Sequence, residues 1–430
     1  MANPGRRASQ SLRQPTLSAS PIRIAYLASA PIIYQVPLLR RLATEPDLSI
    51  TTFFCSDISL KLYDAGFGHN FKWDIPLLGG YDHEFLPALG SLDRVSVWRP
   101  FNYGLGKRLR VGRFQVLWIH GYMRAFNLAA LAVAKRLGIK VLIRDEATPI
   151  SARRGVVIRI IKRALFAALG RLCDGFLAIG SLNREYYRSY CISANRIFDV
   201  PYAVDNEFFG SRRRVTARSR IQLRAALELS GDRPLILNVA RMTARKRAGD
   251  LLDAYAKLSP DGRAEPNASL VFVGDGEKRA ELESRAAALG WNSIRFAGVI
   301  NQTELPAYYD LCDIFVLPSV REPWGLVVNE AMSAGCAVVV SDEVGCGPDL
   351  VRHEQNGYTF RAGDIDQLAQ RLKLLTANPV RCRDMAEKSR EIIRGWSFEQ
   401  DVMGLKAAVA HVLGAVPRAE SAEVSAAYSQ

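Results

Sequence analysis

LPSVREPWGLVVNEAMSAG, residues 317–335, contains the clearest indication of how this chain folds. An apolar run ends at Pro318, the loop EPWG follows, and we expect an apolar helix to begin near Leu326. A buried strand that leads through a short loop into a helix is the building unit of a parallel sheet with crossover helices. Because ligands bind beyond the carboxyl ends of such strands, this loop is also the first candidate for a functional site.

The same rhythm of strand and helix continues on both sides of this stretch. Short apolar runs alternate with helix-length segments, which predicts an α/β protein. The predicted strands are 22–28, 116–119, 140–143, 176–179, 197–200, 235–239, 269–273, 294–296, 314–317 and 337–340. The predicted helices are 37–44, 127–137, 249–258, 278–289, 305–310, 328–334, 365–376 and 399–413.

Segment 211–224 interrupts this rhythm with six arginines and no acidic residue, so we expect a domain boundary here. A chain of 430 residues is also longer than one core of ordinary size requires. We therefore predict two Rossmann-like, doubly wound parallel-sheet domains that face each other across a cleft. The predicted parts are a disordered basic tail (1–20), an amino-terminal acceptor-side domain (21–208) completed by a helix at about 397–415, a carboxy-terminal donor domain (209–396) and a flexible tail (416–430).

The bulk composition narrows the classes of partner. A net charge of +14 favours anionic partners. We expect no nucleic-acid partner, because the sequence has no basic patch with interleaved aromatic residues on which bases could stack. No apolar run reaches about 18 residues, and the first twenty residues lack the apolar centre of a secretory signal. The seven cysteines are dispersed without a CxxC pair, which predicts reduced thiols, a cytoplasmic location and no zinc site.

Two carboxylates eight residues apart, Glu322 and Glu330, flank the start of the expected helix. Backbone amides at 324–327 would attract an anion to the helix N-terminus. Glu330 could accept hydrogen bonds from vicinal hydroxyls such as those of ribose, and Glu322 from a second polyhydroxylated group. The alternative is a surface carboxylate and a capping residue. Because the neighbours of Glu330 are apolar, an unpaired carboxylate would be costly there, and we expect it to have a partner.

A basic loop follows the predicted strand 235–239. It carries Arg241, Arg245, Lys246 and Arg247 directly before a helix, where cations oppose the helix dipole. A bound diphosphate would account for them, since Arg grips two oxygens as a fork and Lys supplies a mobile point charge. The alternative is a solvated basic loop.

Several motifs in this half of the chain resemble the retaining glycosyltransferases of the GT4 group, which have the GT-B fold. The two glutamates with their seven-residue spacer are followed by SAGCAVVVSDEVGCGPDLV (333–351) and NGYTF (356–360). Upstream lie NVARMTARKRAGDLLDAY (238–255), LVFVGDGEKRAELE (270–283) and FAGVINQTELPAYYDLCDIFVLPS (296–319). The resemblance covers residues 235–363, with the motifs in the family's order.

This resemblance implies a role for individual residues and a donor of the UDP-sugar or GDP-sugar class. No Asp-x-Asp pair stands where a metal would bridge the diphosphate, so no metal cofactor is expected and cationic side chains would stabilise the leaving group. The residues matched to catalytic positions are Arg241, Lys246, Glu322 and His120. Those matched to donor-binding positions are Glu330, Gly325, Leu326, Val327, Gly274, Val299 and Ile300.

The amino-terminal half departs more from the family. The loop 29–35 contains no glycine, although the family often has a glycine-rich loop after its first strand. His120 ends a strand and matches the family histidine that contacts the donor sugar; the alternative is a structural histidine. Arg144 and Glu146 could pair with each other instead of binding a ligand. The residues assigned to the acceptor or sugar side are Tyr34, Gln35, Arg144, Glu146 and Asp205.

Segment 153–172 combines six basic residues, no acid and nine large apolar residues. On a helix, Arg159, Lys162 and Arg163 would share one face. Such a helix could lie on an anionic membrane, which would place the protein at the inner face of the cell membrane. The alternative is a core-packed helix with a charged outer face.

The predicted reaction transfers a sugar from a nucleoside diphosphate to an acceptor hydroxyl, in polysaccharide or glycolipid synthesis, with a sugar or lipid-linked sugar as acceptor. Retention, implied by the family, would arise by same-face attack or through a short-lived intermediate. Two alternatives are a nucleotide-sugar epimerase of GT-B type, which needs no acceptor, and a non-catalytic nucleotide-sugar binding protein. The presence of both Glu322 and Glu330 argues against a protein without activity.

Overall fold

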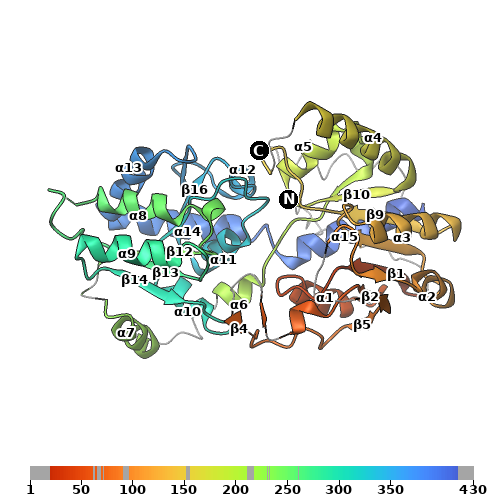
Figure 1. Cartoon of the computed structure of the whole chain (residues 1–430), viewed down its shortest axis with the longest axis horizontal. Helices are drawn as coiled ribbons and strands as arrows, with labels where there is room; N and C mark the ends of the chain where they lie inside the picture. Colours follow the sequence, from red (N-terminus) through yellow and green to blue (C-terminus); the bar gives the residue numbers. More distant parts are fainter. Residues whose placement is uncertain are drawn as a thin grey trace, which may run out of the picture.

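The computed structural model describes residues 20–414 apart from 62, 65–68, 71, 91–95, 152–154, 211–216, 230, 232 and 260. Both predicted tails therefore lie outside the described residues, except for Ser20. Figure 1 shows two α/β domains side by side, each built on a central sheet covered by helices. The α/β prediction with two doubly wound parallel sheets is confirmed.

The amino-terminal domain contains a seven-stranded sheet in the order β11-β10-β9-β8-β1-β2-β5, with every neighbouring pair parallel. Its strand order reverses between β1 and β8, and such a switch point opens a ligand site beyond the carboxyl ends of the strands. The strands are β1 (Ile22–Ala28), β2 (Leu48–Phe54), β5 (Asp82–Phe85), β8 (Val116–His120), β9 (Lys140–Arg144), β10 (Gly175–Ala178) and β11 (Ile197–Asp199). Two small antiparallel pairs flank it: β3 (Tyr63–Asp64) with β4 (His69–Asn70), and β6 (Ala88–Leu89) with β7 (Phe101–Asn102).

The carboxy-terminal domain contains a six-stranded parallel sheet in the order β14-β13-β12-β15-β16-β17. Here the switch point lies between β12 and β15, the two strands whose following loops carry the basic and EPWG motifs. The strands are β12 (Leu235–Val239), β13 (Ser269–Val273), β14 (Ile294–Gly298), β15 (Ile314–Leu317), β16 (Ala337–Ser341) and β17 (Gly357–Phe360).

Helices cover both faces of each sheet (Figure 1). Those of the first domain are α1 (Val36–Ala43), α2 (Leu105–Val111), α3 (Ala125–Arg136), α4 (Val156–Leu172) and α5 (Ser181–Ser189). Those of the second are α6 (Asn206–Gly210), α7 (Ala217–Ala226), α8 (Ala248–Ala256), α9 (Arg279–Leu289), α10 (Leu305–Leu311), α11 (Leu326–Ala334), α12 (Gly347–Leu350), α13 (Ile365–Thr376) and α14 (Pro379–Ile393).

The last helix, α15 (Phe398–Leu413), returns to the first domain (Figure 1). Its residues Val402, Leu405 and Val409 are buried in one core cluster with Ile24 and Tyr26 of β1. A Ser397 capping box fixes its start, since the side chains of Ser397 and Gln400 bind each other's exposed backbone amides. The chain thus crosses between the domains twice.

Helix α4 corrects one prediction about its basic face. Lys162 is 6% exposed, and its Nζ donates to the hydroxyls of Tyr122 at 2.9 Å and Tyr186 at 2.6 Å. Lys162 therefore points inward and does not share an exposed face with Arg159 and Arg163. The alternative of a core-packed helix is confirmed for its inner face, where Phe166 and Leu169 are buried, but most exposed positions in the first turns of α4 are apolar rather than charged.

Candidate functional site between the two sheets

The loops after β12 and β15 bring Lys246 and Glu322 together at the switch point of the second sheet. The Lys246 ammonium donates to Oε2 of Glu322 at 2.5 Å, and both side chains are largely buried. Glu322 is held from both sides, because its amide donates to Glu343 and its carbonyl accepts from Gly345. The bridge is therefore a fixed feature of this edge of the sheet.

The other basic residues of the loop are less buried. Arg241 and Arg245 are exposed, and Nη1 of Arg245 lies 3.9 Å from Oε1 of Glu322 while donating to the carbonyl of Arg321. Arg247 binds Asp250 of α8 at 2.5 Å. Arg245 thus lies beside the Glu322 carboxylate, whereas Arg247 binds within the first turn of α8.

Glu330 has the partner that the sequence predicted for it. The Tyr309 hydroxyl of α10 donates to Oε2 of Glu330 at 2.6 Å. Burial raises the pKa of Glu330 to about 7, and the hydrogen bond from Tyr309 opposes this rise. Glu330 is only partly covered, so a ligand hydroxyl could reach its remaining oxygen.

The start of α11 requires a glycine. Gly325 has φ 100°, a left-handed conformation that side chains disfavour, and a Cβ there would lie 3.0 Å from Leu317. This turn directs the first amides of α11, at Leu326 and Val327, out of the helix N-terminus, where they have no intrahelical acceptor. Such amides attract anions.

Gly274 follows β13 and is explained by close packing of the backbone. Its φ is 128°, and a Cβ would stand 2.0 Å from the carbonyl oxygen of Ala240. No ligand is needed to account for this glycine. It does let the loop after β13 pack directly against the start of the basic loop.

Val299 and Ile300 follow β14 and are partly exposed. The residues that follow form hydrogen bonds to the first domain. Asn301 accepts from the amide of Asp74 at 3.1 Å and donates to the carbonyl of Lys72 at 2.8 Å. The Thr303 amide donates to the Asp74 carboxylate at 3.1 Å. This interdomain contact borders Val299 and Ile300, which the resemblance assigns to donor binding.

On the first domain, Gln35 and His120 meet at the switch point between β1 and β8. The Tyr26 hydroxyl donates to Oε1 of Gln35 at 3.0 Å, which directs Nε2 of Gln35 to Nε2 of His120 at 3.2 Å. Burial lowers the pKa of His120 to about 4, against the opposing effect of Glu146. His120 is therefore a neutral imidazole at physiological pH.

Glu146 is held by two tyrosines. Tyr34 donates to its Oε1 at 3.0 Å and Tyr202 donates to the same oxygen at 2.6 Å. The Tyr202 ring lies 5.8 Å from that of Tyr34 and 6.2 Å from that of Trp324. Tyr202 thus connects the first-domain cluster to the EPWG loop of the second.

Trp324 is buried between the domains rather than facing a ligand. A Cβ on Gly180 would lie 2.3 Å from its ring, and its indole N–H donates to Asn329 at 3.0 Å. Asn329 in turn donates to the carbonyl of Tyr202 at 3.2 Å. The EPWG loop therefore also fixes how the two domains meet.

Two predicted residues serve the fold. Arg144 is 2% exposed and binds Asp401 of α15 at 2.8 Å as well as the carbonyls of Val200 and Pro201, so it neither pairs with Glu146 nor faces a ligand. Asp205 accepts from the amide of Phe208 at 2.8 Å and caps α6.

Sequence reasoning missed four residues of this site: Tyr202, Tyr309, Asn301 and the side chain of Trp324. Their partners are distant in the sequence, and no spacing pattern signals such contacts. Within the described ranges, no group of three or more His, Cys, Asp or Glu could hold a metal ion. None of the described helices has both the length and the apolar character that crossing a bilayer requires.

Residues 219–392 match the family model of glycosyl transferases group 1. The chain is 28% identical to the sulfoquinovosyl transferase SQD2 of Arabidopsis thaliana over 64% of this chain and 53% of that protein. It is 26% identical to a GDP-mannose-dependent alpha-(1-6)-phosphatidylinositol monomannoside mannosyltransferase of Mycobacterium tuberculosis over 56% of this chain and 62% of that protein. The chain thus spans about half to three-fifths of these relatives.

A crystal structure of Alr3699/HepE from Anabaena in complex with UDP superposes with a TM-score of 0.69 at 14% identity, covering 91% of this chain and 100% of that one. This likeness establishes a shared fold, that of the GT-B glycosyltransferases. Residues 219–392 are thus similar to the group 1 glycosyltransferases, and the relatives named above are glycosyltransferases.

Proposed function

We propose that this protein transfers a sugar from a UDP- or GDP-sugar to an acceptor hydroxyl with retention of configuration, in glycolipid or polysaccharide synthesis. The observation that carries the proposal is the junction of Lys246 with Glu322, with the exposed Arg245 3.9 Å from that carboxylate, at the switch point of the second sheet. A diphosphate placed there would meet the ammonium and the first amides of α11.

In this mechanism the bond between the anomeric carbon and the diphosphate oxygen breaks, and Lys246 and Arg241 stabilise the negative charge that develops on the leaving oxygen. The acceptor hydroxyl forms the new bond on the same face, and its proton passes to the departing diphosphate. His120 contributes as a neutral hydrogen-bonding group on the sugar, since burial lowers its pKa to about 4. Glu330 accepts hydrogen bonds from the ribose hydroxyls.

The relatives support this class of donor and acceptor. One is named as a GDP-mannose-dependent enzyme acting on a phosphatidylinositol monomannoside, and a structural neighbour was crystallised with UDP. The contact of Asn301 with Asp74 also fits a reaction between the domains, because a donor on the second sheet must reach an acceptor on the first.

The test is a donor screen read by mass spectrometry, with UDP-sugars and GDP-sugars offered together with a cell lipid extract. We expect one donor to yield a product heavier than an acceptor by one glycosyl residue, and the Lys246→Ala variant to lose it. If wild type converts a donor into an epimer without acceptor, the protein is an isomerase. If no donor is consumed or bound, the proposed function is wrong.

A further inference from the structure

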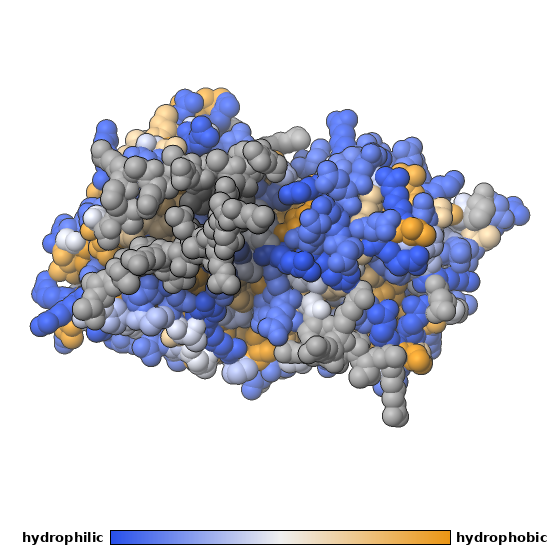
Figure 2. Space-filling model, turned by 180° about the vertical axis from the view of Figure 1, so that it is seen from behind, coloured by the Kyte–Doolittle hydropathy of each residue, from blue (hydrophilic) through white to orange (hydrophobic). Residues whose placement is uncertain are grey.

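The outer face of α4 is apolar although it does not contact the core. Val157, Ile160 and Ile161, at helical spacings of three and four residues, are 70%, 60% and 61% exposed. Ala164 and Ala168 extend the same exposed stripe. The outline of Figure 1 places α4 at the outer edge of the first domain, and Figure 2, seen from behind, shows orange atoms between blue ones at the corresponding upper left margin.

The opposite face already anchors the helix. Phe166 and Leu169 are buried in the first-domain core, and Lys162 donates to two tyrosines there. The fold therefore does not require the exposed stripe to be apolar. Contiguous apolar surface of this kind is characteristic of an interaction site.

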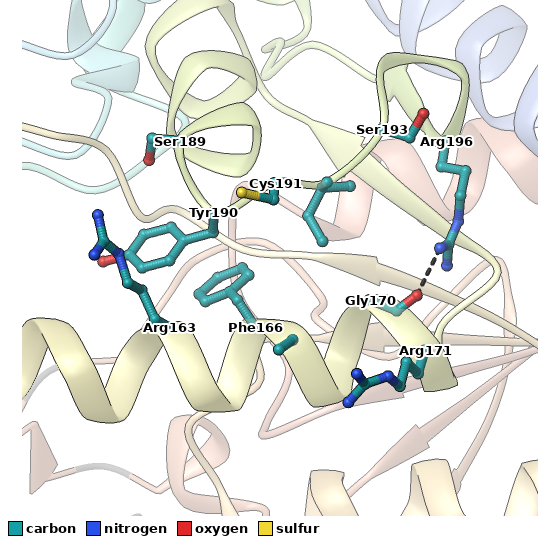
Figure 3. Close-up of a pocket in the computed structure, with 11 residues that line it drawn as sticks. Arg163, Phe166, Gly170, Arg171, Ser189, Tyr190, Cys191, Ser193 and Arg196 are labelled. Carbon is teal, nitrogen blue, oxygen red and sulfur yellow. Dashed lines mark hydrogen bonds between the residues drawn. The ribbon is translucent and has the colours of Figure 1, made fainter.

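A cavity of about 450 Å³ lies beside the stripe, between α4 and residues 189–196 (Figure 3). It is lined by three arginines, and none of its described lining residues is acidic. The lining residues are Arg163, Phe166, Ala167, Gly170, Arg171, Ser189, Tyr190, Cys191, Ile192, Ser193 and Arg196.

The three arginines differ in what they bind. Arg196 donates to the carbonyls of Gly170 and Asp174, so it closes the end of α4. Arg163 and Arg171 are exposed, and neither forms an ion pair with a residue in the described ranges. In Figure 3 the Arg163 side chain extends toward Tyr190, whose ring stacks on Phe166 at 4.5 Å. The cavity is thus lined by the stacked rings of Phe166 and Tyr190, and the side chains of Arg163 and Arg171 can bind an anion there.

We propose that α4 and this cavity form a docking site for an anionic phospholipid. The stripe Val157–Ile160–Ile161 enters the boundary between headgroups and acyl chains, and Arg163 and Arg171 bind the lipid phosphate in or beside the cavity. An apolar stripe flanked by exposed arginines is complementary to an anionic bilayer, whose headgroups are negatively charged and whose acyl layer beneath them is apolar.

Charge complementarity selects this occupant over the amino-terminal segment of the chain and over a second copy. Residues 1–19 carry three arginines and no acid, so they match the arginines of α4 poorly. A second copy docked through the same face would bring like charges together. An anionic bilayer offers the opposite charge and an apolar layer together.

The first test measures flotation of the full chain with vesicles, without any sugar donor, so that its outcome is independent of transferase activity. We expect binding to phosphatidylcholine vesicles with about one-third phosphatidylglycerol and none to pure phosphatidylcholine. Arg163→Gln/Arg171→Gln should weaken binding roughly 5-fold or more per arginine. The matched control Lys107→Gln/Arg110→Gln removes two exposed charges from α2 and should retain more of the binding.

The apolar stripe has its own variant. Ile160→Ser/Ile161→Ser should lower vesicle binding at least about tenfold, since two large apolar contacts are lost. Ile221→Ser, on α7 of the other domain and 69% exposed in the wild type, is the control and should bind normally. Equal binding of wild type and both α4 variants would overturn the proposal.

Cys191 reports on the cavity directly. It is exposed, whereas the other six cysteines are buried, so a maleimide dye should label this position selectively. Anionic vesicles should slow the labelling of wild type but not of Arg163→Gln/Arg171→Gln. If glycerol 3-phosphate protects Cys191 as well as vesicles do and the isoleucine variants float normally, the cavity binds a soluble phosphate and the lipid proposal fails.

Discussion

The Lys246 ammonium and the Glu322 carboxylate meet at 2.5 Å although 76 residues separate them in the chain. The two loops reach each other because β12 and β15 are neighbours in the sheet. Glu322 holds the ammonium at the carboxyl edge of the strands before any ligand arrives. A cation fixed in advance needs no reorganisation when charge develops on a leaving group.

Replacing Lys246 by Ala should lower kcat by about 10²–10³-fold with a smaller change in KM, because the lost charge acts mainly in the transition state. The control is Lys257→Ala, which removes an exposed lysine paired with Asp366 on the same domain and should leave kcat unchanged. Steady-state kinetics with the donor found by the screen measures both. Equal kcat values for wild type and Lys246→Ala would exclude the assigned role.

Donor affinity should rise with pH, because burial raises the pKa of Glu330 to about 7 and only its carboxylate accepts two hydroxyl hydrogen bonds. For a site of this pKa, the Kd should fall about tenfold between pH 6 and pH 8. Calorimetric titration with UDP-glucose and GDP-mannose at both pH values measures the effect. Glu330→Gln should bind with an affinity that does not change with pH, and a wild-type Kd independent of pH would contradict the assignment.

The same carboxyl affects stability in the opposite sense. Its folded pKa lies above the ordinary 4.5, so its contribution is present at low pH and is lost as the pH rises through about 7. The binding and folding profiles of wild type, each compared with Glu330→Gln, should therefore slope in opposite directions with pH.

His120 should make the protein sensitive to acid. Burial lowers its pKa to about 4 from 6.5, so unfolding takes up a proton between these values, and the stability contribution is present above pH 6.5 and lost as the pH falls to 4. His120→Gln keeps an acceptor for Gln35 and should lose less stability over this range, by on the order of 2 kcal/mol. Urea unfolding at pH 7 and pH 4.5 provides the comparison. Parallel losses in both proteins would mean that His120 is not buried as a neutral group.

Removing Asp401 should destabilise the protein strongly, since it would leave the Arg144 guanidinium buried without its counter-ion. Asp401→Ala should cost about 3–5 kcal/mol of unfolding free energy. The double variant Arg144→Met/Asp401→Leu should recover much of that loss, because neither charge remains.

A surface pair supplies the control for this prediction. Glu391→Ala breaks the exposed pair with Lys388 and should cost less than about 1 kcal/mol. Similar unfolding free energies for Asp401→Ala and Glu391→Ala would show that α15 does not depend on its buried ion pair.

Local sequence pattern predicted the strands well and the contacts poorly. β1, β12, β13 and β15 begin and end where they were predicted, because strands buried on both faces are predominantly apolar. By contrast, β5 has the sequence DHEF and lies at the edge of its sheet, so no apolar run marks it. β5 was not predicted, and neither were β2 and β17.

In the site, too, local sequence predicted that a residue needs a partner but not which distant residue provides it. The partner of Glu330 was expected from the cost of a lone carboxylate in an apolar helix, but its identity, Tyr309, depends on how α10 packs on α11. Helical spacing could not predict that the Lys162 side chain is buried. Its ammonium donates to the hydroxyls of Tyr122 and Tyr186, which lie on other segments of the chain. Spacing defines a face of a helix, and only tertiary packing decides where it points.

The return of α15 to the first domain has a consequence for biosynthesis. Val402, Leu405 and Val409 complete a core whose other members, such as Ile24, come mainly from the first half of the chain. On the ribosome, a nascent first domain therefore exposes that apolar surface until nearly the whole chain has been translated. The second domain, whose strands are contiguous in sequence from β12 to β17, can finish folding while the first still awaits its final helix.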